Sequence, residues 1–150
     1  MHFEGKRVWI TGASSGIGEA LAYAFAADGA RLVLSSRRRE VLEQVRSRCV
    51  RPEAHLILPM DVCSAGSIGA AVQVALSLDG GIDVLVNNAG VSQRSLALQA
   101  EEAVERSIME LDFFAPVALS KAVLPSMLAR GRGHVVVVSS VMGYVGTPGS

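Results

Sequence analysis

The sequence predicts an α/β protein built on a doubly wound, parallel β-sheet. Short segments rich in β-branched residues alternate with longer segments whose apolar residues recur at helical spacing, which is the pattern of repeated βαβ units. Most strand segments are continuously apolar rather than alternating, as expected when helices cover both faces of a sheet. A glycine-rich turn joins the first strand to the first helix.

Five strands and four helical segments follow from this pattern. The expected strands are residues 7–11, 31–35, 55–59, 82–87 and 134–139. The expected helices are residues 16–27, 38–48, 64–78 and 101–130. Pro116 lies inside the last segment, so we expect either two helical pieces or one kinked helix there. The chain shows neither an internal repeat nor a low-complexity linker, which predicts one domain over residues 1–150.

Composition narrows the possible functions. Fourteen basic and fourteen acidic side chains cancel, which disfavours nucleic acid or an anionic membrane as a partner. We find no apolar stretch near the roughly 20 residues that cross a bilayer. Cys49 and Cys63 have no metal-ligand spacing, which favours free thiols in a reducing cytoplasm. His2, His55 and His134 are too scattered to predict a metal site.

The turn T-G-A-S-S-G-I-G suits the binding of a diphosphate. The first amides of a helix are unpaired and lie at the positive end of its dipole. Gly12 would permit the tight turn, and Gly16 would let the backbone come close to the phosphates. Gly18 would let the helix pack close to the sheet. Ser14 and Ser15 add hydroxyl donors. The spacing differs from G-x-G-x-x-G, so from the turn alone a plain strand–turn–helix remains open.

Polar residues also follow the third and fourth strands, at the sheet edge where ligands of such folds bind. Asp61 could accept a hydrogen bond from an adenine amino group, or it could cap the next helix. Asn87 and Asn88 could bind a cofactor or satisfy the backbone of neighbouring loops.

The end of the second strand bears on the choice of cofactor. Enzymes that prefer the unphosphorylated dinucleotide tend to place an acid there, about 20 residues after the glycine loop. This chain has Ser36 followed by Arg37, and a guanidinium can hold a 2′-phosphate. The alternative is that residues 37–39 form a solvated helix start. Three cations beside the positive end of a helix dipole favour a nearby anion, and we therefore expect NADP(H) rather than NAD(H).

Four motifs in order resemble the classical short-chain dehydrogenases/reductases: residues 11–18, Asp61-Val62, residues 87–90 and residues 138–140. The resemblance covers essentially the whole chain and implies a Rossmann-type fold with a nicotinamide cofactor. The residues that we expect to bind it are Gly12, Ser14, Ser15, Gly16, Ile17, Gly18, Arg37, Asp61, Val62, Asn87, Ala89 and Gly90.

The resemblance also implies the catalytic groups. Ser140 matches the serine that orients the carbonyl, with Ser139 as the second choice. The family's acid–base tyrosine would lie thirteen residues after Ser140, past the last residue given, and its lysine four residues later. Tyr144 does not replace it, because Pro148 stands four residues on. Asp112 aligns with a family asparagine whose main-chain carbonyl holds a water.

These observations predict an incomplete fold. The family has seven strands, of which five are expected here, and the valine-rich strand 134–139 would leave an open apolar edge. We therefore expect residues 1–150 to be the amino-terminal part of a longer protein. The resemblance further implies a homodimer or homotetramer that pairs through the helical segment 101–130.

The leading hypothesis is an NADP(H)-dependent oxidoreductase that interconverts a hydroxyl and a carbonyl of a small molecule by hydride transfer. Phe113-Phe114 and residues 120–125 resemble the branch of the family that contains reductases of lipophilic carbonyls such as steroids and retinoids, and this resemblance implies a lipophilic substrate. The alternative is a non-catalytic NADP(H) sensor or scaffold, since the tyrosine and lysine are absent from these residues. A serine hydrolase is disfavoured, because neither Ser139 nor Ser140 lies in a G-x-S-x-G elbow.

Overall fold

The computed structural model describes residues 2–145, so Pro148 lies outside the described part of the chain. Five parallel strands form one sheet in the order β3-β2-β1-β4-β5. Their bounds are Arg7–Thr11 (β1), Arg31–Ser35 (β2), Leu56–Ile57 (β3), Val84–Asn87 (β4) and His134–Val137 (β5). The predicted doubly wound α/β fold is confirmed.

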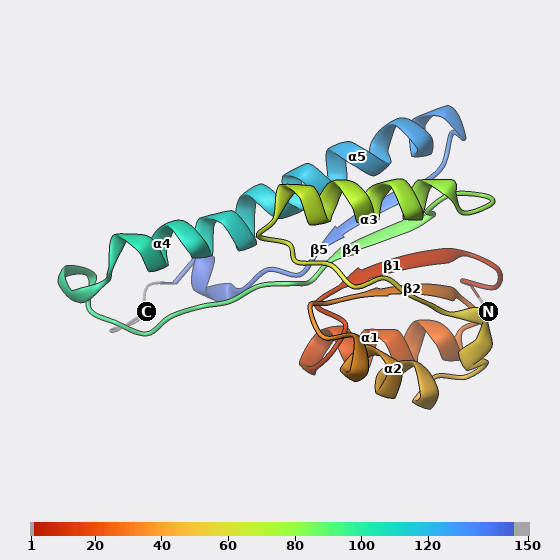
Figure 1. Cartoon of the computed structure of the whole chain (residues 1–150), viewed down its shortest axis with the longest axis horizontal. Coiled ribbons are helices and arrows are strands. Elements are labelled where there is room, and N and C mark those ends of the chain that lie inside the picture. The colour runs from red at the N-terminus through yellow and green to blue at the C-terminus, as the bar shows by residue number, and fades with distance from the viewer. Residues whose placement is uncertain (1, 146–150) are drawn as a thin grey trace.

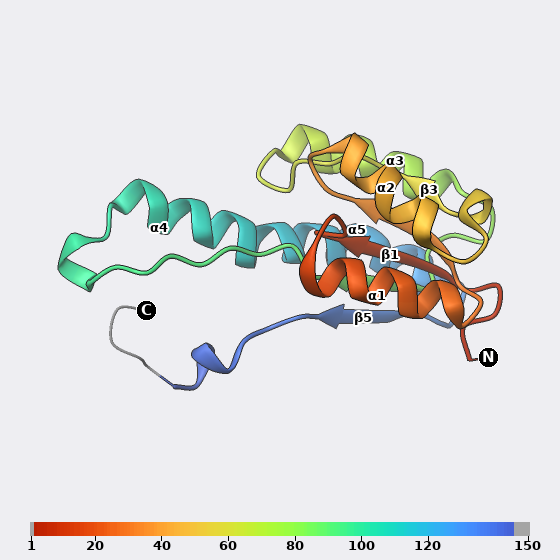
Figure 2. The ribbon, with the colours of Figure 1, turned by 90° about the horizontal axis from the view of Figure 1, so that it is seen from below.

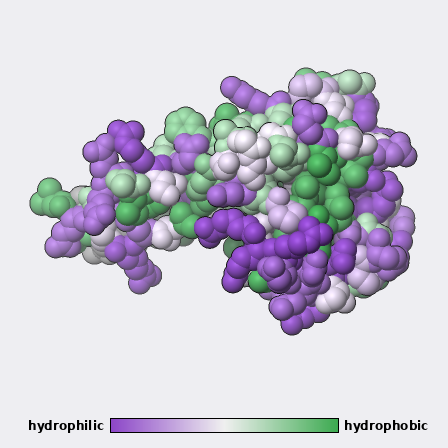
Figure 3. Space-filling model, viewed as in Figure 1, coloured by the Kyte–Doolittle hydropathy of each residue, from purple (hydrophilic) through white to green (hydrophobic). Residues whose placement is uncertain are grey.

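Helices cover the sheet on two sides (Figure 1). On one side lie α1 (Gly16–Ala27) and α2 (Arg39–Arg48), and on the other α3 (Ala65–Ser77), α4 (Glu102–Met109) and α5 (Ala115–Ala129). Helix α4 projects well past the sheet, and the strand-to-helix segment before it runs alongside. Hydrophilic side chains gather over the α1–α2 side in Figure 3.

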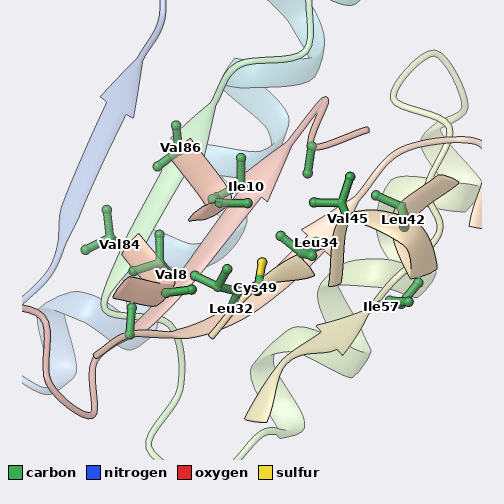
Figure 4. Close-up of a cluster of buried hydrophobic side chains, with 14 residues drawn as sticks. Val8, Ile10, Leu32, Leu34, Leu42, Val45, Cys49, Ile57, Val84 and Val86 are labelled. Atoms are coloured by element: carbon green, nitrogen blue, oxygen red, sulfur yellow. The ribbon is translucent and has the colours of Figure 1, made fainter. Parts of the chain in front are cut away.

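Side chains alternate between two hydrophobic cores, one on each face of the sheet. Val8 and Ile10 pack in the cluster that includes residues of α1 and α2, drawn in Figure 4, whereas Trp9 packs with residues of α3 and α5. This is the period of two that a strand imposes, with both faces buried. The indole Nε1 of Trp9 donates to Ser35 Oγ at 2.9 Å, so its one polar atom is satisfied in the core.

Several predicted strands are longer than the observed ones. The third begins after His55, whose ring rather than its backbone bonds the amide of Leu32 on β2. It ends at Ile57, although the Leu58 and Met60 amides still donate to the Leu34 and Ser36 carbonyls. The fourth starts at Val84 instead of 82, and the fifth ends at Val137 instead of 139. Strand pairing depends on neighbours that are remote in sequence, which is why these ends were misplaced.

The segment around Pro116 is one helical run, not two pieces. The π-helical turn Glu110–Phe114 joins α4 to α5, with the Ala115 amide bonded to the Glu110 carbonyl. The run Glu102–Ala129 has 28 residues, and an 18-residue window within it has a mean hydropathy of 1.4, so by length and composition alone it could cross a membrane. The expectation that no stretch approaches this length is therefore wrong, although core helices pass the same test.

Strand β5 is an edge strand within residues 2–145 and is exposed along its length. Val135, Val136 and Val137 are 38%, 42% and 58% exposed. Figure 2 shows β5 at the margin of the sheet, with no helix drawn against its outer side. The open apolar edge expected from the sequence is present in the described chain.

Candidate functional site

A cavity of about 530 Å³ opens at the carboxyl ends of the central strands, beside the start of α1. Among the expected cofactor residues, those that line it are Gly12, Ser14, Ser15, Ile17, Arg37, Asp61, Val62, Ala89 and Gly90. Ser36, Arg38, Met60, Cys63, Asn88, Ser107 and Leu111 also line it. The three predicted motifs after β1, β3 and β4 are thus brought to one place.

The glycines shape the turn in different ways. Gly12 has φ +63°, and a Cβ there would lie 2.9 Å from the Cα of Ala89. Gly16 has φ +55° and open space where its Cβ would be, so its glycine is required by backbone conformation. A Cβ on Gly18 would collide with the Gly12 carbonyl and the Asn88 amide. Gly16 and Gly18 do not line the cavity, and Gly18 packs tightly on the turn itself rather than on the sheet.

The amides of the turn are available to a ligand. The Ala13 amide donates to the Ser35 carbonyl at 3.1 Å, and the Glu19 amide donates to the Ser15 carbonyl at 3.2 Å. Between them, the amides of residues 14–18 make no hydrogen bond within residues 2–145. Ser15 is the N-cap of α1, yet its hydroxyl makes no capping bond. A row of free donors therefore lies at the positive end of a helix dipole.

Thr11 and Asn88 tie this turn to the loop after β4. Thr11 Oγ1 accepts from the amides of Asn88 and Ala89, both at 3.0 Å, and donates to the Val86 carbonyl at 3.3 Å. Asn88 Nδ2 donates to the carbonyls of Thr11 at 3.1 Å and Gly12 at 3.2 Å. Of the two roles left open for Asn88, its amide group fills the structural one. Thr11 was not among the predicted site residues, although a hydroxyl at the end of a buried strand was a signal.

The carboxyl end of β2 supplies the positive charge of the cavity. Arg37 and Arg38 both line it, whereas Arg39 turns to Glu43 in an exposed ion pair of 3.2 Å. The Ser36 hydroxyl is buried and has no hydrogen-bond partner within residues 2–145. Of the two arginines, only Arg37 was predicted from the sequence as a cofactor-binding residue. An unsatisfied hydroxyl beside two guanidinium groups that make no ion pair within the described chain suits a phosphate.

Asp61 does not cap the helix that follows it. Its Oδ1 accepts the Cys63 amide at 3.0 Å, and its own amide donates to Ser67 Oγ at 2.9 Å. The N-cap of α3 is Ser64, whose hydroxyl accepts the Ser67 amide. Asp61 is thereby held at the cavity wall, with its second carboxylate oxygen available. Burial and the nearby Asp61 charge raise the pKa of the Cys63 thiol, which keeps that thiol protonated.

A second cavity, of about 540 Å³, adjoins the first between β5 and the π-helical turn. The predicted residues Ile17, Asn87, Ala89, Gly90, Asp112, Ser139 and Ser140 line it. Ser140 Oγ accepts the Met142 amide at 3.2 Å, which leaves its hydroxyl proton free to be donated. Tyr144 is 93% exposed and lines neither cavity.

Asp112 and Asn87 line the second cavity, and each is hydrogen-bonded to another part of the chain. Asp112 Oδ1 accepts the Val91 amide at 3.0 Å and so holds the loop after β4 against the π-helical turn. Pro116, four residues on, has no N–H for the Asp112 carbonyl, which therefore lacks its α-helical partner. Asn87 Nδ2 donates to Ser120 Oγ at 3.2 Å, while its buried Oδ1 has no partner within residues 2–145.

A family model described as short chain dehydrogenase matches residues 6–150. The chain belongs to the short-chain dehydrogenase family. Curated relatives include Dehydrogenase/reductase SDR family protein 7-like of Anopheles gambiae, 46% identical over 98% of this chain and 48% of the relative. Dehydrogenase/reductase SDR family member 7 of Homo sapiens is 45% identical over 94% of this chain and 43% of its own length. This short-chain dehydrogenase therefore spans about half the length of these relatives.

Solved structures of dehydrogenases match the fold closely. One from Streptomyces avermitilis has a TM-score of 0.91 at 36% identity, covering 97% of this chain and 52% of its own. A gluconate 5-dehydrogenase from Burkholderia cenocepacia, in complex with NADP and tartrate, has a TM-score of 0.89 at 31% identity. The match covers 98% of this chain and 58% of the gluconate 5-dehydrogenase chain. The predicted family and Rossmann-type fold are confirmed, and the family implies a nicotinamide cofactor.

Proposed function

We propose that the first cavity binds NADP(H) and that the whole protein is an oxidoreductase interconverting a hydroxyl and a carbonyl. The observation that carries this proposal is the row of unbonded amides, residues 14–18, at the start of α1 beside two cavity-lining arginines. The bound dinucleotide would supply the hydride. This chain's own residues would bind the dinucleotide and orient the carbonyl.

The geometry supports a diphosphate at the turn. Backbone amides at a helix start donate to anionic oxygens, and the dipole favours the negative charge. Ser14 and Ser15 add hydroxyl donors from the same wall. Gly16 carries no Cβ and has open space where one would be, so its own side chain does not hinder the approach of a ligand to the turn.

Three adjacent residues support the phosphorylated cofactor. Arg37 and Arg38 offer guanidinium donors, and the unpartnered Ser36 hydroxyl offers a third group where an acid would repel a 2′-phosphate. The NADP complex of gluconate 5-dehydrogenase concerns that relative, yet it is consistent with this preference. We therefore propose NADP(H) over NAD(H).

The second cavity suits the reacting carbonyl. The Ser140 hydroxyl can donate to a carbonyl oxygen, and the Asp112 main-chain carbonyl, which receives no N–H from Pro116, could hold a water that passes on a proton. The acid–base tyrosine and lysine that the family resemblance implies are not assigned to any residue of this chain. We further propose a small, lipophilic carbonyl or alcohol as substrate, a homodimer or homotetramer, and a cytoplasmic location with both cysteines reduced.

The cofactor proposal is tested by titrating NADPH and NADH into the wild type and the Arg37→Asp variant. Loss of a charge-assisted phosphate contact should weaken NADPH binding by about 10- to 100-fold and leave NADH binding nearly unchanged. Arg39→Asp is the matched control, because Arg39 pairs with Glu43 and does not line the cavity. An unchanged NADPH preference in Arg37→Asp would refute the role of Arg37. Binding without turnover by the whole protein would support a sensor instead.

A further inference from the structure

His55 is a buried imidazole that lies outside both cavities. It is 4% exposed and immediately precedes β3. Its Nδ1 accepts the Leu32 amide of β2 at 3.1 Å, and its Nε2 lies 2.8 Å from the Val50 carbonyl. Nε2 must therefore carry the proton and Nδ1 must be bare. Both contacts are to main chain, so the fold specifies a neutral ring in one tautomer.

The bond to Leu32 lengthens a short strand pairing. β3 pairs with β2 at only two positions, Val33 with Leu56 and Leu34 with Ile57. One position earlier, the imidazole takes the place of a backbone acceptor for the Leu32 amide. If Nδ1 carried a proton, two donors would face each other, the Nδ1–H group and the Leu32 amide. The hydrogen bond between them would then break.

Charges around the ring oppose its protonation on balance. Burial lowers the pKa of His55, the bond to the Val50 carbonyl raises it, and the charge of Arg51 lowers it. Two smaller effects follow: the charge of Glu53 raises this pKa and that of Arg46 lowers it. Arg46 belongs to α2, and Arg51 and Glu53 lie at the short 3-10 turn Pro52–Ala54. Glu4 sits 3.5 Å from Arg51 and partly offsets its charge. From β2, the Leu32 amide donates a hydrogen bond to the ring. The side chain of the neighbouring Arg31 is exposed.

The same strand leads into the wall of the first cavity. After β3 the chain stays attached to β2 through the Leu58 amide on the Leu34 carbonyl and the Met60 amide on the Ser36 carbonyl, both at 2.9 Å. Residues 60–63 then line the cavity. His55 thus anchors the start of a segment whose end forms the proposed cofactor site.

We propose that His55 is a proton-sensitive latch whose protonation frees the start of β3 from β2, loosens the wall at residues 60–63 and weakens cofactor binding. The part concerning the cofactor rests on the proposed function. Because the folded ring favours the neutral form, the latch contributes stability above about pH 6.5, the ordinary value for histidine, and loses it as the pH falls below.

The test compares the wild type with His55→Asn, whose Oδ1 can accept the Leu32 amide but does not titrate. His134→Asn is the control, because it removes an exposed imidazole at the start of another strand. Urea unfolding without cofactor and NADPH affinity are measured from pH 8 to pH 5. The 2′-phosphate itself titrates near pH 6, so only the ratio between variants at each pH isolates the imidazole.

From pH 8 to pH 5 the wild type should lose about fivefold more NADPH affinity than His55→Asn, the equivalent of one typical hydrogen bond. His134→Asn should follow the wild type. Parallel unfolding profiles of wild type and His55→Asn would overturn the latch. Unequal unfolding profiles with a constant affinity ratio would overturn its coupling to the cavity.

Two further outcomes distinguish a failure of the proposed cofactor binding from a failure of the His55 latch. If NADPH binds neither protein at any pH, the proposed function fails, and the unfolding profiles without cofactor still decide the latch. If His55→Asn does not fold, the amide resonance of Leu32 in the wild type decides it. That resonance should shift with the same midpoint as the loss of affinity, and an invariant resonance would overturn the proposal.

Discussion

Gly18 shows how one missing methyl group shapes the site. It is buried in the first turn of α1, and a Cβ there would meet the Gly12 carbonyl and the Asn88 side chain. Gly18→Ala should lower the free energy of unfolding by about 1–3 kcal/mol, because backbone must shift to admit the methyl group. It should also weaken NADPH binding, since the shift moves the unbonded amides. Urea unfolding and cofactor titration measure the two effects.

Gly69→Ala provides the control for this change. Gly69 lies in α3, and nothing stands within 4 Å of where its Cβ would be. There alanine should stabilise the protein by about 0.5–1 kcal/mol, because it restricts the unfolded chain and favours helix. Equal stability of the two alanine variants would show that the close contact at Gly18 is absent.

At the scale of elements, Asp83 joins strands and a helix at the end of the sheet opposite the cavities. Its Oδ2 accepts the Arg7 amide of β1 at 2.9 Å, and its Oδ1 accepts Arg130, which follows α5, at 2.9 Å. The Asp83 carbonyl accepts the His134 amide at the start of β5. Burial alone would raise the pKa of the Asp83 carboxyl, but the bonds from Arg7 and Arg130 outweigh it and lower that pKa.

This network predicts acid sensitivity. A carboxyl whose pKa is lowered by folding contributes stability above its ordinary value of 3.8 and loses it as the pH falls through the folded value. Asp83→Asn should therefore lower the free energy of unfolding by about 1–3 kcal/mol at pH 7. The deficit should shrink from pH 5 to pH 2.5 in urea titrations. Asp79→Asn, a neighbouring carboxylate without these bonds, should show no such convergence; a constant deficit for Asp83→Asn would contradict the assignment.

At the scale of the whole molecule, the exposed strand β5 predicts self-association of the 150-residue chain. Flat apolar edges pair with other chains, and charged residues on such edges prevent this. Val136→Lys on β5 should therefore lower the average mass seen in sedimentation. Val74→Lys, at a comparably exposed site on α3, should leave the mass unchanged. A monomeric wild type at micromolar concentration would refute this prediction.

The sequence by itself determined the order of elements, the glycine turn and most cavity-lining residues, because these depend on local backbone conformation and on the two periodicities. Strand ends, the π-helical turn before Pro116 and the ring contacts of His55 were decided by partners far along the chain. The free amides of residues 14–18 and the tie between Thr11 and Asn88 likewise became visible only in three dimensions. A hydrogen bond needs both partners placed, and a sequence states only which partners exist.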